Sequence, residues 1–166
     1  MTQIPLLQTN RLTLRPMTFA DWPDYAACMQ TERVHYMGGG PFSIPTAWGI
    51  FCADHAQWDL FGFDGLMIED RHTRLCLGQV GINAGPLFPE CELGWMVFPQ
   101  SEDQGIAFEA AKALRNWAQS EGALPTLVSY VDPDNARSRR LAERLGAVQD
   151  ETAEKQDETD IVYRHF

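Results

Sequence analysis

The chain has 166 residues, 45% of them hydrophobic and 11% aromatic, so it is long enough for one domain with a substantial core and too apolar to be disordered. Its net charge of −10 argues against general nucleic-acid binding, which requires a basic surface; it is compatible with cationic partners such as amines, although solubility alone also accounts for it. No apolar run reaches the roughly 18 residues of a membrane-spanning helix, and the N-terminal stretch lacks a signal-peptide pattern, so we expect a cytoplasmic protein with no membrane partner.

Cysteines and histidines form no recognisable ligand pattern. The four cysteines contain no C-x-x-C pair, so we expect them to be buried as small hydrophobic residues in a reducing compartment. The four histidines do not have the spacing of a zinc site. The sequence therefore predicts no metal site.

Strand and helix patterns alternate through the first 98 residues. Leu12 and Leu14 alternate with polar neighbours, which is typical of a half-buried strand. The turn EDRHT (69–73) separates two apolar strand patterns, which indicates an antiparallel pair. The elements expected here are a strand at 11–17, one or two short helices at 18–29, a glycine-rich loop at 35–43, a helix at 44–62, and strands at 65–70, 74–83 and 91–98.

The second part of the chain contains the clearest helix, at 103–122. Its small residues fall on one face at helical spacing, which would let the helix lie close to a sheet. A continuous apolar strand at 125–131, a helix at 134–147 and a final strand at 160–166 follow. This order predicts a mixed α/β (α+β) fold, a single domain over residues 1–166 with a central sheet flanked by helices.

The stretch PQSEDQGIAFEAA (99–111) leads from a predicted strand into that helix. The first amide groups of a helix lack internal partners, and the helix dipole adds positive charge, so such an end can bind phosphate. Gly105 would let a ligand approach the backbone closely. An ordinary turn in which Asp103 caps the helix explains the same residues.

A second strand-to-helix turn lies at YVDPDNARS (130–138). Asn135 and Ser138 would both project from the first helical turn, near the end of the preceding strand, where α/β sheets bind ligands. Helix capping by Asn135 is the alternative explanation.

Together, the two turns resemble the GNAT superfamily of acetyl-CoA-dependent N-acetyltransferases, and within it the branch of the ribosomal-protein N-terminal alanine acetyltransferases. The openings TNRLTLRPM (9–17) and LGQVGI (77–82) are similar to strands of that branch. The branch's E-[IL]-G-[YW] strand, proline, Q/R-x-x-G-x-G/A loop and A-x-E-A helix correspond to Glu92, Leu93, Gly94, Trp95, Pro99, Gln100, Gly105, Ala107, Glu109 and Ala110. The later N-x-x-S…L-G-F/A element corresponds to Asn135, Ser138, Leu145, Gly146 and Ala147.

The resemblance implies a GNAT-type domain that binds acetyl-CoA where its central strands separate. The pantetheine arm would lie along the 95–97 strand, the pyrophosphate would meet amides of about 103–107, and the later helix would contact the pantetheine or nucleotide end. The cofactor-binding residues so implied are Trp95, Met96, Val97, Asp103, Gln104, Gly105, Ile106, Ala107, Asn135 and Arg139.

Two positions depart from the family pattern. Asp103 stands where the loop has its first glycine, and we expect its side chain to point outward, away from the phosphates, and to cap the helix. Ala142 stands where many members have a tyrosine that protonates the leaving thiolate. Ser138 is the substitute that the resemblance implies, and Glu92 could accept the amine proton through water, with a merely structural carboxylate or bulk water as alternatives.

The acceptor side of such a protein would lie between about Trp22 and Phe63, a segment that is rich in aromatic residues, most of which we expect in the core. The function predicted is transfer of an acetyl group to a primary amine, either a small molecule or a protein N-terminus, with a homodimer as a possible assembly. The alternative is a non-catalytic CoA-binding or regulatory module, which the Asp103 and Ala142 departures favour and the intact Asn135, Ser138 and Gly105 disfavour.

Overall fold

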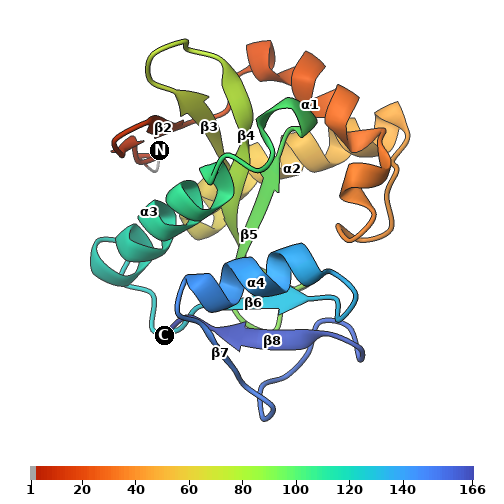
Figure 1. The fold of residues 1–166 in the computed structure, drawn as a ribbon, viewed down its shortest axis with the longest axis vertical. Helices are drawn as coiled ribbons and strands as arrows, with labels where there is room; N and C mark the ends of the chain where they lie inside the picture. The colour runs from red at the N-terminus through yellow and green to blue at the C-terminus, as the bar shows by residue number, and fades with distance from the viewer. Residues whose placement is uncertain (1–2) are drawn as a thin grey trace.

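The computed structural model describes residues 3–166, so the first two residues of the expected domain lie outside it. Within these residues, eight strands form one sheet in the order β1-β2-β3-β4-β5-β6-β8-β7 (Figure 1). The strands are β1 (Leu7–Gln8), β2 (Leu12–Arg15), β3 (Leu66–Asp70), β4 (Cys76–Asn83), β5 (Glu92–Val97), β6 (Val128–Val131), β7 (Val148–Gln149) and β8 (Ile161–Arg164). All neighbours are antiparallel except β5 and β6, which makes the sheet mixed as predicted.

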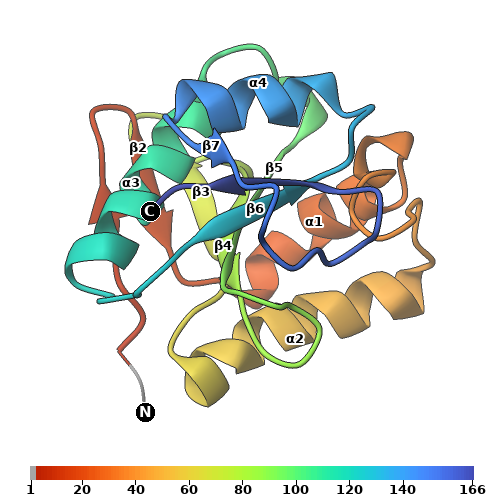
Figure 2. The same cartoon turned by 90° about the horizontal axis from the view of Figure 1, so that it is seen from below.

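Helices cover both faces of the sheet (Figure 2). One face carries α3 (Ile106–Ser120) and α4 (Ala136–Arg144), and the other carries α1 (Trp22–Met29) and α2 (Ile44–Phe61). The small residues Ala110, Ala111 and Ala118 of α3 are fully buried, so the helix packs closely on the sheet as its sequence predicts. Short 3-10 turns occur at Phe19–Asp21, Glu32–Val34 and Pro99–Ser101.

Local sequence explains where α2 begins and ends. Ser43 caps it by accepting a hydrogen bond from the Thr46 amide, and Pro45 lies in its first turn. Gly62 ends it with φ of +77°, a left-handed conformation that favours glycine. The chain therefore reverses within a few residues and enters β3.

The expected elements were confirmed. The structure adds two strands of two residues each, β1 and β7, that the sequence did not predict. The helix expected from residue 103 begins at Ile106, and Gly105 is its N-cap. The prediction that Asp103 caps this helix is therefore wrong. The strand expected from residue 125 is regular only from Val128.

Across residues 3–166, no helix is both long and apolar enough to cross a membrane. The same residues contain no group of three or more His, Cys, Asp or Glu side chains arranged to hold a metal ion. Of the four cysteines, Cys28 is buried, Cys76 and Cys91 are partly buried and Cys52 is exposed, so the expectation of four buried cysteines is wrong for Cys52.

Candidate active site

The central feature of the sheet is the separation of β5 from β6. These parallel strands share a single register pair, Glu92 with Val128, and then diverge (Figure 1). On its other side, β5 stays paired with β4 along its whole length. Trp95, Met96 and Val97 therefore lie where β5 has no strand partner on the β6 side, which leaves backbone groups on that edge available to a ligand.

A hydrogen bond spans this gap. The indole Nε1 of Trp95 donates to the hydroxyl of Ser138 on α4 over 3.3 Å. Asn135 accepts a hydrogen bond from the Ser138 amide over 3.2 Å and so caps α4. The Asn135 capping considered from sequence is confirmed, and it fixes the first turn of α4 so that the Ser138 hydroxyl faces β5.

The loop between β5 and α3 contains two residues with left-handed backbone, Asp103 and Gly105. Gly105 has φ of +74°, and Asp103 has φ of +58°, a conformation in which non-glycine residues are uncommon. Asp103 thus adopts the backbone conformation expected of the glycine that it replaces. The first amide groups of α3, those of Ile106 and Ala107, follow directly and precede the first intrahelical hydrogen bond, from Glu109 to the Gly105 carbonyl.

Two arginines neutralise the acidic residues of this loop. Arg137 of α4 contacts both Glu102 and Asp103 over 2.8 Å, and Arg33 contacts Glu102 over 2.8 Å. Arg33 also donates to the Val97 carbonyl at the end of β5. The Asp103 side chain is 87% exposed and points to Arg137, so it does point outward.

The structure separates two arginines that the sequence did not distinguish. Arg139, the residue expected at the nucleotide end, donates to the Pro133 carbonyl and interacts with Tyr163. Arg137 faces the loop instead. Sequence reasoning missed Arg137 and Arg33, and the excess of Glu102 and Asp103 in a phosphate-type loop was the one signal that called for nearby cations.

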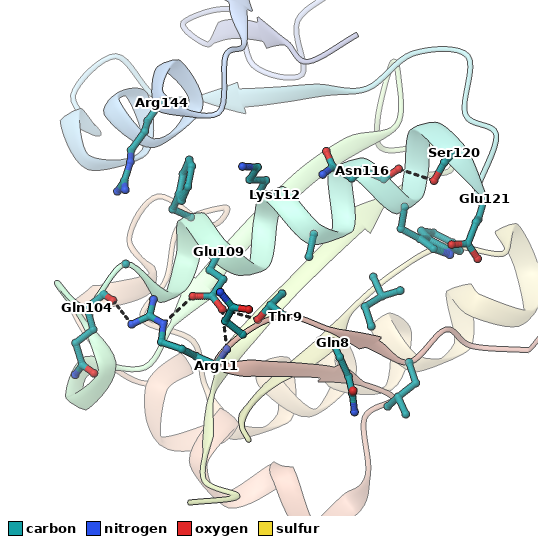
Figure 3. Close-up of a pocket in the computed structure, with 17 residues that line it drawn as sticks. Gln8, Thr9, Arg11, Gln104, Glu109, Lys112, Asn116, Ser120, Glu121 and Arg144 are labelled. Carbon is teal, nitrogen blue, oxygen red and sulfur yellow. Dashed lines mark hydrogen bonds and ion pairs between the residues drawn. The ribbon is translucent and has the colours of Figure 1, made fainter. Parts of the chain in front are cut away.

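Gln104 is turned toward the N-terminal part of the chain. Its carbonyl accepts a hydrogen bond from Arg11 over 2.9 Å, and Arg11 pairs with Glu109 of α3 over 2.7 Å (Figure 3). A groove of about 910 Å³ follows the outer side of α3 here, between residues 6–11 and the helix. It begins at Gly105 and runs along α3 past Lys112, with Arg144 on the α4 side, so it lies beside the loop rather than between β5 and β6.

Glu92 lies at the start of the strand separation, on the opposite face from Ser138. Side chains alternate along β5, so Glu92, Gly94 and Met96 face α1 and α2, whereas Trp95 faces α3 and α4. Glu92 accepts a hydrogen bond from the amide of Asn83, its cross-strand partner. Burial, opposed by this hydrogen bond and reinforced by Asp160, raises the pKa of Glu92 to about 7, which suits a general base.

The aromatic residues between Trp22 and Phe63 divide into three groups. Tyr25, Phe51 and Trp58 are buried, while Trp22 and Phe42 are partly buried against the core cluster that contains Tyr25 and Phe51. Tyr36, Trp48 and Phe61 are exposed. Most of the segment's aromatics therefore belong to or pack on the core, as expected.

Comparisons with known proteins agree with this geometry. The family model described as an acetyltransferase (GNAT) domain matches residues 11–148. An acetyltransferase from Agrobacterium tumefaciens str. C58 is 50% identical, with 99% of this chain and 95% of that chain covered and a TM-score of 0.94. A ribosomal-protein-S5-alanine acetyltransferase from Vibrio fischeri shares the fold at 15% identity, with 97% and 94% covered and a TM-score of 0.69.

Two proteins of Bacillus subtilis (strain 168) are also similar. The N-acetyltransferase YoaA is 27% identical over 86% of this chain and 82% of that protein. YkkB is 30% identical over 105 residues, which are 62% of this chain and 61% of YkkB.

The fold and the family comparison define an acyltransferase. The chain belongs to the GNAT acetyltransferase family. It is an acetyl-CoA-dependent N-acetyltransferase, with acetyl-CoA as its acyl donor.

Proposed function

We propose that the protein acetylates a primary amine by direct attack on acetyl-CoA within a ternary complex. The observation that carries this proposal is the position of Glu92 and Ser138 on opposite faces of β5, at the point where β5 leaves β6. A base on one face and a hydroxyl on the other fit a reaction in which the amine approaches a thioester held between them.

In this proposal the donor follows the site from strand to loop. The pantetheine arm lies along Trp95, Met96 and Val97, and a backbone amide of that strand stabilises the oxyanion. The pyrophosphate meets the loop of Asp103, Gln104 and Gly105 and the first amides of α3, from Ile106 and Ala107. Asn135 and Arg139 stay candidate contacts for the pantetheine and nucleotide ends, and Arg137 is the more direct candidate for phosphate because its guanidinium already faces the loop.

The chemical step needs two proton transfers. The amine nitrogen attacks the thioester carbonyl, its proton passes to Glu92 through water, and the carbon–sulfur bond breaks to leave a thiolate. Ser138 then protonates the thiolate and regains its proton from water, while Glu92 releases the amine proton to solvent. The hydrogen bond from the Trp95 indole helps this transfer, because it stabilises the negative charge that develops on the serine oxygen.

Release of CoA thiol in the presence of a panel of amines and short peptides tests this proposal. We expect turnover in wild type, and loss of turnover with retained acetyl-CoA binding in Glu92→Gln. Binding of acetyl-CoA without turnover on any amine or peptide would contradict the proposed transfer.

A further inference from the structure

The buried and partly buried carboxylates of this protein fall into two kinds. One kind is neutralised by arginine: Asp21 and Glu69 pair with Arg15, Glu109 pairs with Arg11, and Glu90 and Asp150 pair with Arg164, all within 2.8 Å. The other kind comprises Asp54, Asp64 and Glu92, which we name the unpaired carboxyl cluster. Within the part of the chain that the structure describes, none of these three forms an ion pair with a basic side chain.

Asp54 is held by hydrogen bonds from neutral groups. It projects from α2, and its Oδ2 accepts from the side-chain amide of Gln79 over 2.9 Å and from the hydroxyl of Tyr25 over 3.2 Å. Gln79 is on β4, on the same face as Glu92, because Gln79 is paired with Met96 and Asn83 with Glu92. The position of Asp54 is therefore fixed on the face of the sheet from which Glu92 projects.

Asp64 is the second member, and one of its oxygens has no partner. Asp64 comes two residues after Gly62, where the chain reverses. The hydrogen bond from Trp58 Nε1 to the Gly65 carbonyl, 3.0 Å long, fixes the connection between α2 and β3. Asp64 is 2% exposed, and its Oδ1 accepts from the Gly65 amide, whereas its buried Oδ2 has no hydrogen-bond partner among residues 3–166. A buried polar atom without a partner costs about 1–3 kcal/mol, which a protein tolerates where the atom serves a ligand.

The members of this cluster affect one another's pKa values. Burial, and then repulsion by Asp54, raise the pKa of Asp64 to about 9, and Glu92 adds to the effect. Burial raises the pKa of Asp54 to about 6. These carboxyls differ from the arginine-paired carboxylates because no basic side chain of the described residues lies within ion-pair distance of them.

Two glycines lie between Asp54 and Glu92 on this face of the sheet. Gly81 and Gly94 are cross-strand partners on this face, and both are partly exposed. Neither contributes a side chain, and the backbone of Asp64 and Gly65 lies within 3.4 Å of the point where a side chain of Gly81 would begin. A Cβ on Gly65 would lie 2.5 Å from Nε2 of Gln79, the atom that binds Asp54, so Asp54 and the Asp64–Gly65 segment meet at Gln79. Gln79 and Asn83, which hold Asp54 and Glu92, are four residues apart on β4, or roughly 13 Å along the strand.

We propose that Asp54 and Asp64 form a second cation site, which binds a protonated amino group of the acceptor while Glu92 faces the amine that becomes acetylated. The acceptor is then a small aliphatic amine with at least two basic nitrogens. This inference rests on the proposed amine acetylation and adds the acceptor's class. A protein N-terminus fits less well, because it carries one ammonium group followed by neutral peptide groups. Once a bound ammonium group displaces the proton that burial favours on Asp64, the ionised Asp54 and Asp64 accept hydrogen bonds and donate none to a peptide carbonyl.

Matched pairs of acceptors test the second site. Diaminooctane is compared with octylamine, and diaminobutane with butylamine, by kcat and KM for release of CoA thiol. The variants are Asp64→Asn and Asp54→Asn, with Asp59→Asn as the control, because Asp59 is an exposed carboxylate on the same helix. Asparagine is close in shape to the protonated Asp64 that burial favours, so this variant is expected to fold.

We expect wild type and Asp59→Asn to prefer diaminooctane over octylamine by about tenfold or more in kcat/KM, mainly through KM. Asp64→Asn and Asp54→Asn should bring that ratio toward one. Equal use of both amines by wild type, an unchanged preference in both variants, or a peptide N-terminus as the better acceptor would overturn the second site while leaving amine acetylation intact.

Calorimetric titration of the protein–CoA complex with diaminooctane separates this inference from the proposed function. If no amine is acetylated, the proposed function fails, and the binding measurement still decides on the cation site. Diamine binding that is weakened at least about tenfold in Asp64→Asn but unchanged in Asp59→Asn supports the site. Absence of binding, or equal binding in all variants, refutes it.

Discussion

Replacing Asp103 with glycine separates the backbone role of this residue from the effect of its charge. Asp103 has φ of +58° and one ion pair, with Arg137, in which the two side chains are 87% and 46% exposed. The left-handed conformation costs about 1 kcal/mol for a non-glycine residue, and an exposed ion pair contributes about 0–1 kcal/mol. Glycine removes both terms but increases the entropy of the unfolded chain by about 0.4–1 kcal/mol. We therefore expect the free energy of unfolding to change by less than about 1 kcal/mol.

The effect on donor binding should be larger. At roughly 8 Å from a phosphate, one negative charge costs about 0.5 kcal/mol at the dielectric constant of water and about 2 kcal/mol at an effective value of 20. Removal of that charge also frees Arg137 from one of its two partners. We expect Asp103→Gly to tighten CoA binding about 3- to 30-fold at low ionic strength, with a smaller gain at high salt.

Calorimetric titration with CoA at low and high salt measures this effect, and Asp103→Asn is the matched control. Asparagine tolerates the left-handed conformation and lacks the charge, so it should tighten binding as glycine does. Arg137→Ala should weaken binding in either background. If Asp103→Gly weakens CoA binding, or if its effect is independent of salt, the account of an outward-pointing carboxylate that opposes the phosphates is wrong.

Three further predictions concern the catalytic residues and Asp64. Glu92→Gln should lower kcat about 10²- to 10⁴-fold without weakening acetyl-CoA binding. In wild type, kcat/KM should rise with pH through about 7, because Glu92 must lose its proton to act as a base. The variant should lose this pH dependence. Ser138→Ala should lower kcat about 10- to 100-fold. Trp95→Phe keeps the Ser138 hydroxyl but removes the hydrogen bond that the indole donates to it, and should lower kcat less. Equal rates of Ser138→Ala and wild type in steady-state assays would exclude the serine as the acid. Because the pKa of Asp64 is raised in the folded protein, the free energy of unfolding of wild type should fall as pH rises from about 4 to about 9. In urea unfolding, the stability of Asp64→Asn relative to wild type should therefore increase by more than about 1 kcal/mol between pH 5 and pH 8. A stability difference that does not change with pH would refute the buried, unpaired carboxyl.

Local patterns were sufficient to predict most of the fold. The alanine stripe of α3 identified both the helix and the face that packs on the sheet, and alternation in 11–17 identified β2. β1 and β7 were missed because two residues carry no period, and only pairing with β2 and β8 defines them. Asp103 was misassigned as a cap because its left-handed backbone depends on the loop as a whole and not on residue type.

Residues for the donor side of the site were easier to name from the sequence than residues for the acceptor side, and their roles stay predictions. Trp95, Gly105 and Asn135 belong to short motifs, whose spacing survives in a linear sequence. The choice between Arg137 and Arg139 required the placement of α4 against the loop, since both lie in one helical turn. Asp54 and Asp64 come together only through the end of α2 and its hydrogen-bonded connection to β3, and no sequence pattern marks that pair.

The two sides of the site differ in how charge is balanced, and this difference bears on recognition. At the loop, two arginines already hold Glu102 and Asp103, so a phosphate that binds there, as we propose, would have to compete with carboxylates for these guanidinium groups. On the α1–α2 face, Asp54, Asp64 and Glu92 have no such partners in the described chain, and their pKa values are raised. In the proposed complex, an anionic donor and a cationic acceptor would therefore be selected by opposite means: exchange of existing ion pairs for the donor, and neutralisation of unpaired carboxyls for the acceptor. Higher salt should consequently weaken the competition at the exposed loop more than attraction at the buried carboxyls, because screening acts mainly on exposed charges.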